Sequence, residues 1–459
     1  MSHPVPASRP SRGPRSALSG ATLDLTWFAV ALVLVAVAFL VGAALNVRGV
    51  PLHAPNAAPL LAAWQPRVAP TTPAAVAIAV LVVGWGPAIA HRLGWRWLLL
   101  AAYVTSASWV FALGLVDGWS RLATRLASHG EYLTEVADAP PPLQLLSTYA
   151  GRIIHGQPDS WATHVAGHPP GALEFFVLLD RVGLGGGGWA AAVCMLAGSS
   201  ACVAVAIALH SLAGEQMARS AAPYLVVVPA ALWIGVSADA FFLAVSAWGI
   251  ALLAVATHAS GVRGDLAAVG SGLLFGYTVY LSYGLVLVAA IAGAVLLAGR
   301  RVRPGLVALA AVAAVVVAVT AAGFWWWDGY QHLVIRYHQG VGGERPYAYW
   351  VWANVAALVL CTGPAMAAGL RRTGVQAVTA ARTRCRTPGW GLAAVVLGAA
   401  LALAVATISG LSKGEVARIW LPFALWLVPA CALLPRPRLW LAVQVTTALL
   451  LQHLLLINW

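Results

Sequence analysis

Apolar segments of about 20 residues recur along the whole chain, and this repetition constrains the fold more than any other feature. A helix of that length just spans the hydrocarbon core of a bilayer. Of the 459 residues, 61% are hydrophobic and only 9% are charged, whereas a soluble domain carries about a quarter charged residues. The sequence therefore predicts an all-α polytopic membrane protein. The thirteen predicted spans lie near residues 25–45, 73–91, 97–115, 190–213, 220–236, 239–257, 265–281, 282–299, 304–324, 350–368, 389–408, 419–434 and 438–457.

The distribution of charge predicts the orientation of these spans. The chain has 27 Lys and Arg residues against 14 Asp and Glu residues, which gives a net charge of +13. If the N-terminus is cytoplasmic, alternation places 17 of the 27 basic residues on the cytoplasmic side, where such residues collect, and 11 of the 14 acidic residues outside. We therefore expect a multi-pass plasma-membrane protein whose partner is the lipid bilayer and not nucleic acid.

The segment 116–189 is the longest predicted loop, and loops of this length tend to be functional or disordered. Two pieces of it, 119–136 and 141–154, have apolar residues at helical spacing and predict helices lying in the membrane interface. A third piece, 170–183, is apolar but only about 14 residues long. We expect this piece to insert partly, because a full crossing would invert all later spans and move the Arg-rich loops outside.

Two positions at the ends of this loop carry candidate chemistry. Asp117 follows an apolar span at the outer membrane boundary, where partial desolvation can tune the pKa of a carboxylate. That position suits a general base, although an ordinary Asp-Gly helix end in contact with water fits the same residues. His168 precedes two prolines that open an apolar helix, so it can donate to an anionic headgroup or simply cap the helix in solvent. The spacing of His155, Asp159, His164 and His168 is no recognised coordination motif, so the sequence does not indicate a metal or other cofactor.

Further candidates lie in other segments that are predicted to face outward. Asp239 begins a span, and a carboxylate carried towards lipid is a functional candidate by default, although it can also cap its helix. Lys413 and Arg418 stand at the mouth of a late span, where they can hold a phosphate diester or form a self-paired surface cluster with a neighbouring carboxylate. The remaining candidates are two cations and two carboxylates, namely Arg336, Arg345, Glu131 and Glu415.

Taken together, these features resemble the GT-C superfamily of polytopic glycosyltransferases, in particular the protein O-mannosyltransferases and the lipid A aminoarabinose transferases. In that family an acidic residue opens a long extracytoplasmic loop, and Asp117 has the matching position. A Lys-Pro-Pro-like motif closes the loop, as His168–Pro170 does here, and a later span begins with an Asp that Asp239 matches. The stretch GLLFGYTVYLSYG is similar to a glycine pattern of the family, and Arg418–Pro422 is similar to its R-x-x-L-P entry.

The resemblance covers roughly residues 97–435 and leaves the rest of the chain outside the family module. The chain departs from the family by having Asp117-Gly118 in place of Asp-Glu, and His168 in place of Lys. The resulting expectation is a disordered cytoplasmic tail over 1–24, two additional spans over 25–96, the GT-C-like module over 97–435 and a last span over 436–459. The high Ala, Val, Gly and Arg content resembles that of actinobacterial proteins.

The resemblance implies inverting transfer of a sugar, such as mannose or arabinose, from a polyprenyl-phosphate donor to a glycan, lipid or protein acceptor of the cell envelope. Asp117 would act as general base on the acceptor hydroxyl, and nearby cations would stabilise the departing phosphate. The implied donor-phosphate ligands are His168, Lys413, Arg418, Arg336 and Arg345, with Glu131, Asp239 and Glu415 as other site residues.

Other functions fit a chain of this kind. A transporter of a lipid or envelope precursor is the main alternative, but we find no internal repeat, and charge is nearly absent from the predicted midplane. Another outward-facing transferase that uses a lipid-linked substrate would use the same histidines and arginines. A non-catalytic scaffold for envelope assembly would tolerate the loss of Asp117.

Overall fold

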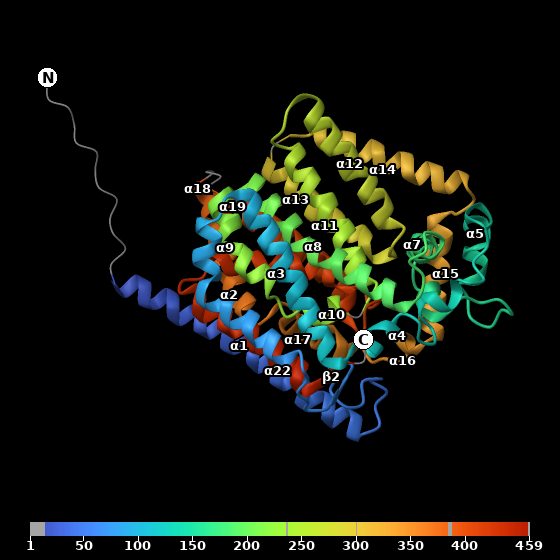
Figure 1. The fold of residues 1–459 in the computed structure, drawn as a ribbon, viewed down its shortest axis with the longest axis horizontal. Coiled ribbons are helices and arrows are strands. Elements are labelled where there is room, and N and C mark those ends of the chain that lie inside the picture. The colour runs from blue at the N-terminus through green and yellow to red at the C-terminus, as the bar shows by residue number, and fades with distance from the viewer. Residues whose placement is uncertain (1–13, 236, 300, 384–387, 458–459) are drawn as a thin grey trace.

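The computed structural model describes residues 14–235, 237–299, 301–383 and 388–457, and almost every regular element among them is a helix (Figure 1). Two short strands, β1 (Ala62–Trp64) and β2 (Leu455–Ile457), pair antiparallel with Ala62 opposite Ile457. The pairing joins the segment that follows the first helix to the end of the last one. The predicted all-α class is thus confirmed, apart from this small sheet.

Among the described residues, seven helices are long and apolar enough to cross a membrane, which supports a polytopic membrane protein. Each of them coincides with a predicted span. They are α1 (Pro14–Val47), α2 (Thr72–Arg92), α3 (Trp95–Gly114), α8 (Gly187–Ala213), α11 (Asp239–Ala256), α14 (Arg303–Ala321) and α19 (Pro388–Ile408).

The predicted number of thirteen spans is not confirmed, because the other apolar segments form shorter, more polar or interrupted helices. The predicted span 350–368 is broken at Gly363, whose φ is +83°, into α17 (Tyr347–Thr362) and α18 (Ala365–Thr383), which meet at 100°. Counting this bent pair as one span gives eight. The remaining segments contain α9 (Glu215–Val226), α10 (Ala231–Ile234), α12 (Gly261–Val279), η4 (Tyr283–Leu287), α13 (Val288–Gly299), α20 (Val416–Ile419), α21 (Leu421–Ala424), η5 (Leu425–Leu433) and α22 (Pro437–Leu454).

One end of the helix bundle is held together by arginines. Asp24 of α1 is only 1% exposed and accepts hydrogen bonds from Nη2 of Arg371 at 2.7 Å and from Nη2 of Arg372 at 2.6 Å. Helix α1 begins at Pro14, within the segment 1–24 that was expected to be a disordered tail, and these ion pairs anchor its first turns; residues 1–13 lie outside the described residues. Helices α1 and α18 are therefore in contact at Asp24 and Arg371, in segments that the charge pattern assigns to the cytoplasmic side of the membrane.

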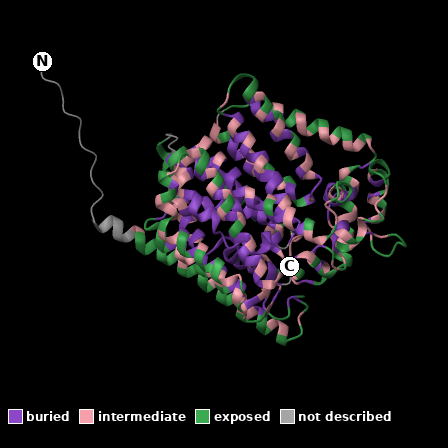
Figure 2. Cartoon of the chain, in the orientation of Figure 1, coloured by how far each residue is buried: buried purple, intermediate pink, exposed green. Residues whose placement is uncertain are grey.

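The interior of the bundle is built around α8 and α11, while α1 and α14 keep most of their apolar side chains on the outside (Figure 2). Leu40 of α1 is 71% exposed and Leu309 of α14 is 63% exposed, as expected of helices that face lipid. Helices α12 and α14 approach closely at Gly272, where a Cβ would overlap the backbone oxygen of Ala308. Small residues permit such contacts between membrane helices.

The long loop after α3 folds into short helices at the opposite end of the bundle. They are η1 (Leu115–Asp117), α4 (Trp119–Arg125), η2 (Tyr132–Glu135), α5 (Pro142–Thr148), η3 (Ala150–Arg152), α6 (Thr163–Ala166) and α7 (Pro170–Arg181). Both pieces predicted to be helical, 119–136 and 141–154, are helical in part. Helix α7 has 12 residues, too few to cross a bilayer, as expected for this piece.

Two more helices lie at this end, α15 (Trp326–Gln339), beside α5 and α7 in Figure 1, and α16 (Val341–Glu344), near α4. The ring nitrogen Nδ1 of His332 in α15 donates to the backbone oxygen of Ala150 at 2.9 Å. This contact ties α15 to the long loop.

Candidate functional site

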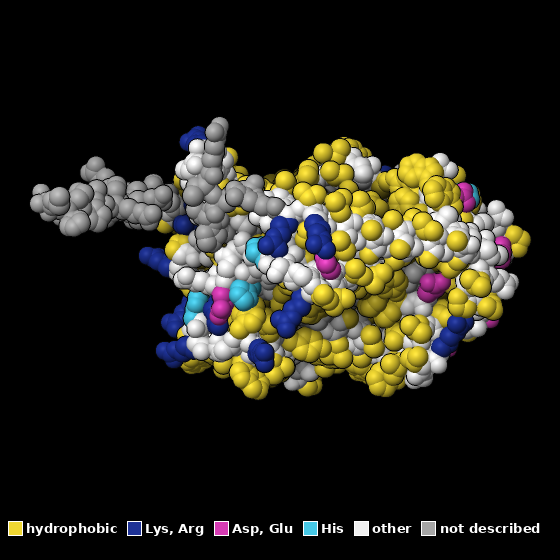
Figure 3. Space-filling model, turned by 90° about the horizontal axis from the view of Figure 1, so that it is seen from above, with side chains coloured by type: hydrophobic (Ala, Val, Ile, Leu, Met, Phe, Trp, Pro, Cys, Tyr) yellow, Lys and Arg dark blue, Asp and Glu magenta, His cyan; other side chains and the backbone are white. Residues whose placement is uncertain are grey.

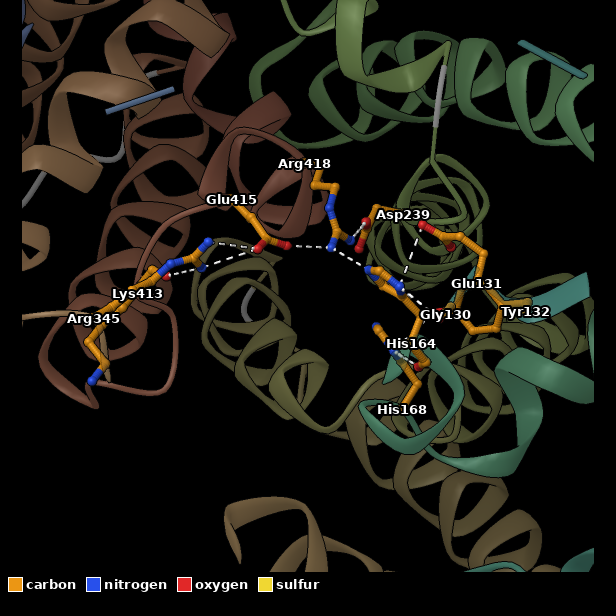
Figure 4. A network of polar contacts seen from close by, with 10 residues as sticks. All are labelled: Gly130, Glu131, Tyr132, His164, His168, Asp239, Arg345, Lys413, Glu415 and Arg418. Carbon is orange, nitrogen blue, oxygen red and sulfur yellow. Dashed lines mark hydrogen bonds and ion pairs between the residues drawn. The ribbon is translucent and has the colours of Figure 1, made fainter. Parts of the chain in front are cut away.

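The candidate site lies where the long loop meets the start of α11 and the short helix α20 (Figure 4). Glu131 directly precedes η2, His164 is in α6, Asp239 is the first residue of α11 and Arg418 is in α20. Glu415 has a φ of +61°, a left-handed conformation that turns the chain into α20. Four segments far apart in the sequence therefore place charged side chains together.

Arg418 is at the centre of this cluster and is 7% exposed. Its Nη1 donates to Oδ2 of Asp239 at 2.8 Å, and its Nη2 donates to Oε2 of Glu415 at 2.7 Å and to Nε2 of His164 at 2.9 Å. Burial alone would lower the pKa of Arg418, but the two carboxylates outweigh it and raise the pKa. The guanidinium is therefore permanently charged and bridges three segments.

Arg345 extends the cluster to the segment before α17. Its Nη1 and Nη2 each donate to Oε1 of Glu415 at 3.1 Å, and Nη1 also donates to the backbone oxygen of Lys413 at 2.6 Å. Burial would raise the pKa of Glu415, but Arg418 and Arg345 together lower it. Glu415 is therefore an ionised carboxylate held between two arginines.

His164 has a defined protonation state in this arrangement. Its Nε2 accepts a hydrogen bond from Arg418, so the ring proton is on Nδ1, which lies 3.0 Å from the backbone oxygen of Gly130 and 3.5 Å from Oε1 of Glu131. Burial, with a further contribution from the charge of Arg418, lowers the pKa of His164 to about 3. The ring is therefore neutral and orients the guanidinium without adding charge.

Glu131 is the carboxylate of the cluster with the most unusual pKa. The residue is 6% exposed, and burial raises its pKa to about 7, although Arg418 and Arg125 partly offset this effect. A carboxylate with this pKa exchanges its proton near neutral pH, which is the property required of a general base or acid.

His168 lies against the cluster, and its predicted role as a phosphate ligand remains untested. Its Nδ1 lies 2.7 Å from the backbone oxygen of His164 and 2.9 Å from the hydroxyl of Tyr132, so Nδ1 carries the proton. Burial lowers the pKa of His168, which keeps the ring neutral and leaves Nε2 as an acceptor. Among the described residues Nε2 has no hydrogen-bond partner. A bare ring nitrogen suits a substrate hydroxyl better than the predicted phosphate.

Asp117 is paired with Arg67 and is not part of the network around Arg418. Nε of Arg67 donates to Oδ1 of Asp117 at 2.7 Å, in a pair whose side chains are 15% and 8% exposed respectively. Arg67 follows β1, and its backbone N–H donates to the oxygen of His453 at 2.8 Å. Within the described residues, no ion pair or hydrogen bond joins Asp117 to Arg418 or Glu131. Its predicted role as general base remains untested, and the structure does not bring it into the cluster.

Lys413 and Arg336 are the predicted phosphate ligands that lack a carboxylate partner among the described residues. Nζ of Lys413 lies 5.7 Å from the ring centroid of Tyr337. Arg336, the residue before Tyr337, donates through Nη2 to the backbone oxygen of Trp161 at 3.4 Å, and its Nη1 is buried without a hydrogen-bond partner. Both cations thus keep donors available for an anion.

The structure therefore brings Asp239, Glu415, Arg418, Arg345 and Glu131 into one network, with Lys413 and His168 at its edges. Sequence reasoning missed two partners, His164 as a partner of Arg418 within the network and Arg67 as the partner of Asp117 outside it. No local pattern marks either one, because their partners are distant in the sequence. The described residues contain no group of three or more side chains that could hold a metal.

The sequence matches no model of a known protein family and no curated protein.

Proposed function

We propose that the protein is a membrane glycosyltransferase that moves a sugar from a polyprenyl-phosphate donor to an extracytoplasmic acceptor of the cell envelope. The observation that carries the proposal is the buried Glu131, with a pKa of about 7, next to the network of Arg418 at one end of the apolar helices. A proton acceptor beside fixed cations at a membrane boundary is what transfer from a lipid-linked phosphate requires.

In the proposed reaction, the acceptor hydroxyl attacks the anomeric carbon while its proton passes to the carboxylate of Glu131. The bond from the anomeric carbon to the phosphate oxygen breaks, and the phosphate leaves with the electron pair. Glu131 replaces Asp117 as our candidate for the base because Asp117 is paired with Arg67, outside the network. The bare Nε2 of His168 can accept a hydrogen bond from a sugar hydroxyl and orient it.

The donor phosphate is assigned to Lys413 and Arg336. Arg418 and Arg345 already hold Glu415, and Arg418 also holds Asp239, so their charges are largely neutralised within the protein. Lys413 and Arg336 have no such carboxylates among the described residues. Arg345 supports this assignment indirectly, since its bond to the Lys413 backbone oxygen fixes the segment that carries the lysine.

The apolar part of the donor requires a surface of its own. A cavity of about 230 Å³ lies between α11, α12, α13 and α14 and is lined almost entirely by apolar side chains, including Leu253, Phe275, Val279, Val288 and Leu309. The backbone oxygen of Val279 accepts a hydrogen bond from Trp326 of α15, so the cavity reaches the end of the bundle where the site is. Part of a prenyl chain fits this chemistry.

The test is transfer from polyprenyl-phosphate mannose, arabinose or glucose in reconstituted membranes. Glu131→Gln should lower the rate at least about 100-fold, the effect of losing a general base, while leaving expression and folding unchanged. Asp138→Asn is the matched control because Asp138 is an exposed carboxylate of the same loop, and it should keep the wild-type rate.

Asp117→Asn separates the two candidates for the base. If Asp117→Asn abolishes transfer and Glu131→Gln does not, the base is Asp117 and the geometric assignment is wrong. If none of the three donors is used by the wild-type protein, the proposed function is itself refuted for these sugars.

A further inference from the structure

A groove lies between Trp27 of α1 and one face of α18, at the end of the bundle that contains Asp24 and away from the candidate site. Its volume is about 540 Å³. One wall is Trp27 of α1, and the other is a face of α18 on which Arg371, Val375, Val378 and Arg382 follow one another at helical spacing. The groove therefore combines an apolar surface with two guanidinium groups.

The apolar part of the groove is unusually open. Trp27 is 49% exposed, Val375 is 52% exposed and Val378 is 50% exposed. Helix α18 turns away from α17 by 100°, and it carries basic residues on a face next to these apolar side chains. A helix of this composition lies in the membrane interface, with its apolar side chains among acyl chains and its charges at the headgroups.

The charges around the groove are not balanced within the described part of the chain. Asp24 is shared by Arg371 and Arg372, so one positive charge of this triad remains. Arg382 is exposed and has no ion-pair partner among the described residues, and Nε of Arg371 is buried without a hydrogen-bond partner. Figure 3 shows that most Lys and Arg side chains of the face seen from above gather towards the end where α1 begins.

We propose that this groove binds an anionic phospholipid. The phosphate contacts Arg382, and the acyl chains lie along Val378, Val375 and Trp27, towards Arg371. Charge complementarity selects this occupant, because basic pockets between membrane helices bind anionic headgroups. A zwitterionic lipid has the same acyl chains to pack against the apolar wall, but its headgroup has no net charge to neutralise the excess positive charge of the arginines.

The test is a lipid titration of the purified full-length protein, followed by native mass spectrometry. Phosphatidylglycerol and phosphatidylcholine with identical acyl chains are the two probes. The wild-type protein should bind phosphatidylglycerol more tightly. Arg382→Gln should weaken that binding about fivefold, the effect of one arginine near an anionic headgroup, and should leave phosphatidylcholine unchanged.

Arg263→Gln is the matched control, because Arg263 is also an exposed helical arginine but does not line the groove. It should bind both lipids as the wild-type protein does. Equal affinity of the wild-type protein for the two lipids, or equal losses in Arg382→Gln and Arg263→Gln, would overturn the proposal. Arg382 is tested in preference to Arg371 because it is exposed, so its substitution leaves the buried ion pair with Asp24 intact.

Discussion

Replacing Glu131 by Gln should change how the stability of the protein depends on pH. The folded protein holds the proton of Glu131 up to a pKa of about 7, whereas the unfolded chain releases it near the ordinary value of 4.5. Between these two values the folded state binds more protons than the unfolded state. The free energy of unfolding contributed by this group therefore falls as the pH rises through that interval, and it stays at its lower value above pH 7.

The size of the effect follows from the same interval. Each pH unit over which only the folded state keeps the proton is worth about 1.4 kcal/mol, so the whole interval is worth on the order of 3 kcal/mol. This magnitude is not reduced much by solvent, since Glu131 is 6% exposed. The Gln side chain has a similar shape and does not titrate, so the variant should lack this loss of stability between pH 4.5 and 7.

His164 acts in the opposite direction, so the comparison must be made between variants and not between pH values alone. Its pKa of about 3 in the folded protein lies below the ordinary value of 6.5, and its contribution to stability therefore rises with pH over that interval. This contribution is present in both proteins and cancels in the difference between wild type and Glu131→Gln.

The assay is unfolding of the detergent-solubilised protein, followed by tryptophan fluorescence at several pH values from about 4.5 to about 8. The wild-type protein should lose stability relative to Glu131→Gln as the pH rises, while Asp138→Asn should run parallel to the wild-type protein. Parallel curves for wild type and Glu131→Gln would show that the carboxylate is ionised throughout, and the argument for Glu131 as a proton acceptor near neutral pH would fail.

Substitutions of Asp24, Gly272 and Asp239 test the packing. Asp24→Asn should destabilise the protein by about 3–5 kcal/mol because it leaves buried arginines without a carboxylate, and an unchanged melting temperature would contradict the ion pairs of α1 with α18. Gly272→Ala should cost about 1–3 kcal/mol through overpacking against α14, whereas Gly293→Ala, where a Cβ meets nothing within 4 Å, should be neutral in the same thermal assay. Asp239→Asn should lower thermal stability by removing a charged partner of the buried Arg418, and Asp239→Glu should restore part of it.

A helix could be predicted from the sequence wherever the length of an apolar segment is enough to determine it. Among the described residues, all seven helices that are long and apolar enough to cross a membrane correspond to predicted spans, because about 20 apolar residues need no distant partner to form a spanning helix. The number of spans was less predictable, because breaks such as the one at Gly363 depend on local backbone conformation within an apolar segment. The length of the piece 170–183 did indicate correctly that α7 is too short to cross.

Several residues of the candidate site could be predicted from the sequence, but the contacts between them could not. Asp239, Glu415 and Arg418 stood out because charge at the end of an apolar segment is costly unless it is paired or used. Which residues pair could not be read from the sequence, since the partners of Arg418 come from segments 179 and 254 residues away. For the same reason the partner of Asp117, which is 50 residues away at Arg67, was not foreseen.

The net charge of the network explains why the proposed function assigns proton exchange and phosphate binding to different residues. Two arginines, Arg418 and Arg345, face the two carboxylates Asp239 and Glu415, so these four side chains sum to no net charge. Burial opposes a further charge on Glu131, and this is the main physical cause of its raised pKa, although Arg418 and Arg125 partly offset it. A neutral scaffold of this kind cannot attract a phosphate by itself. The anion must therefore be held at the edge of the cluster, where cations without carboxylate partners lie, while Glu131 exchanges its proton inside it.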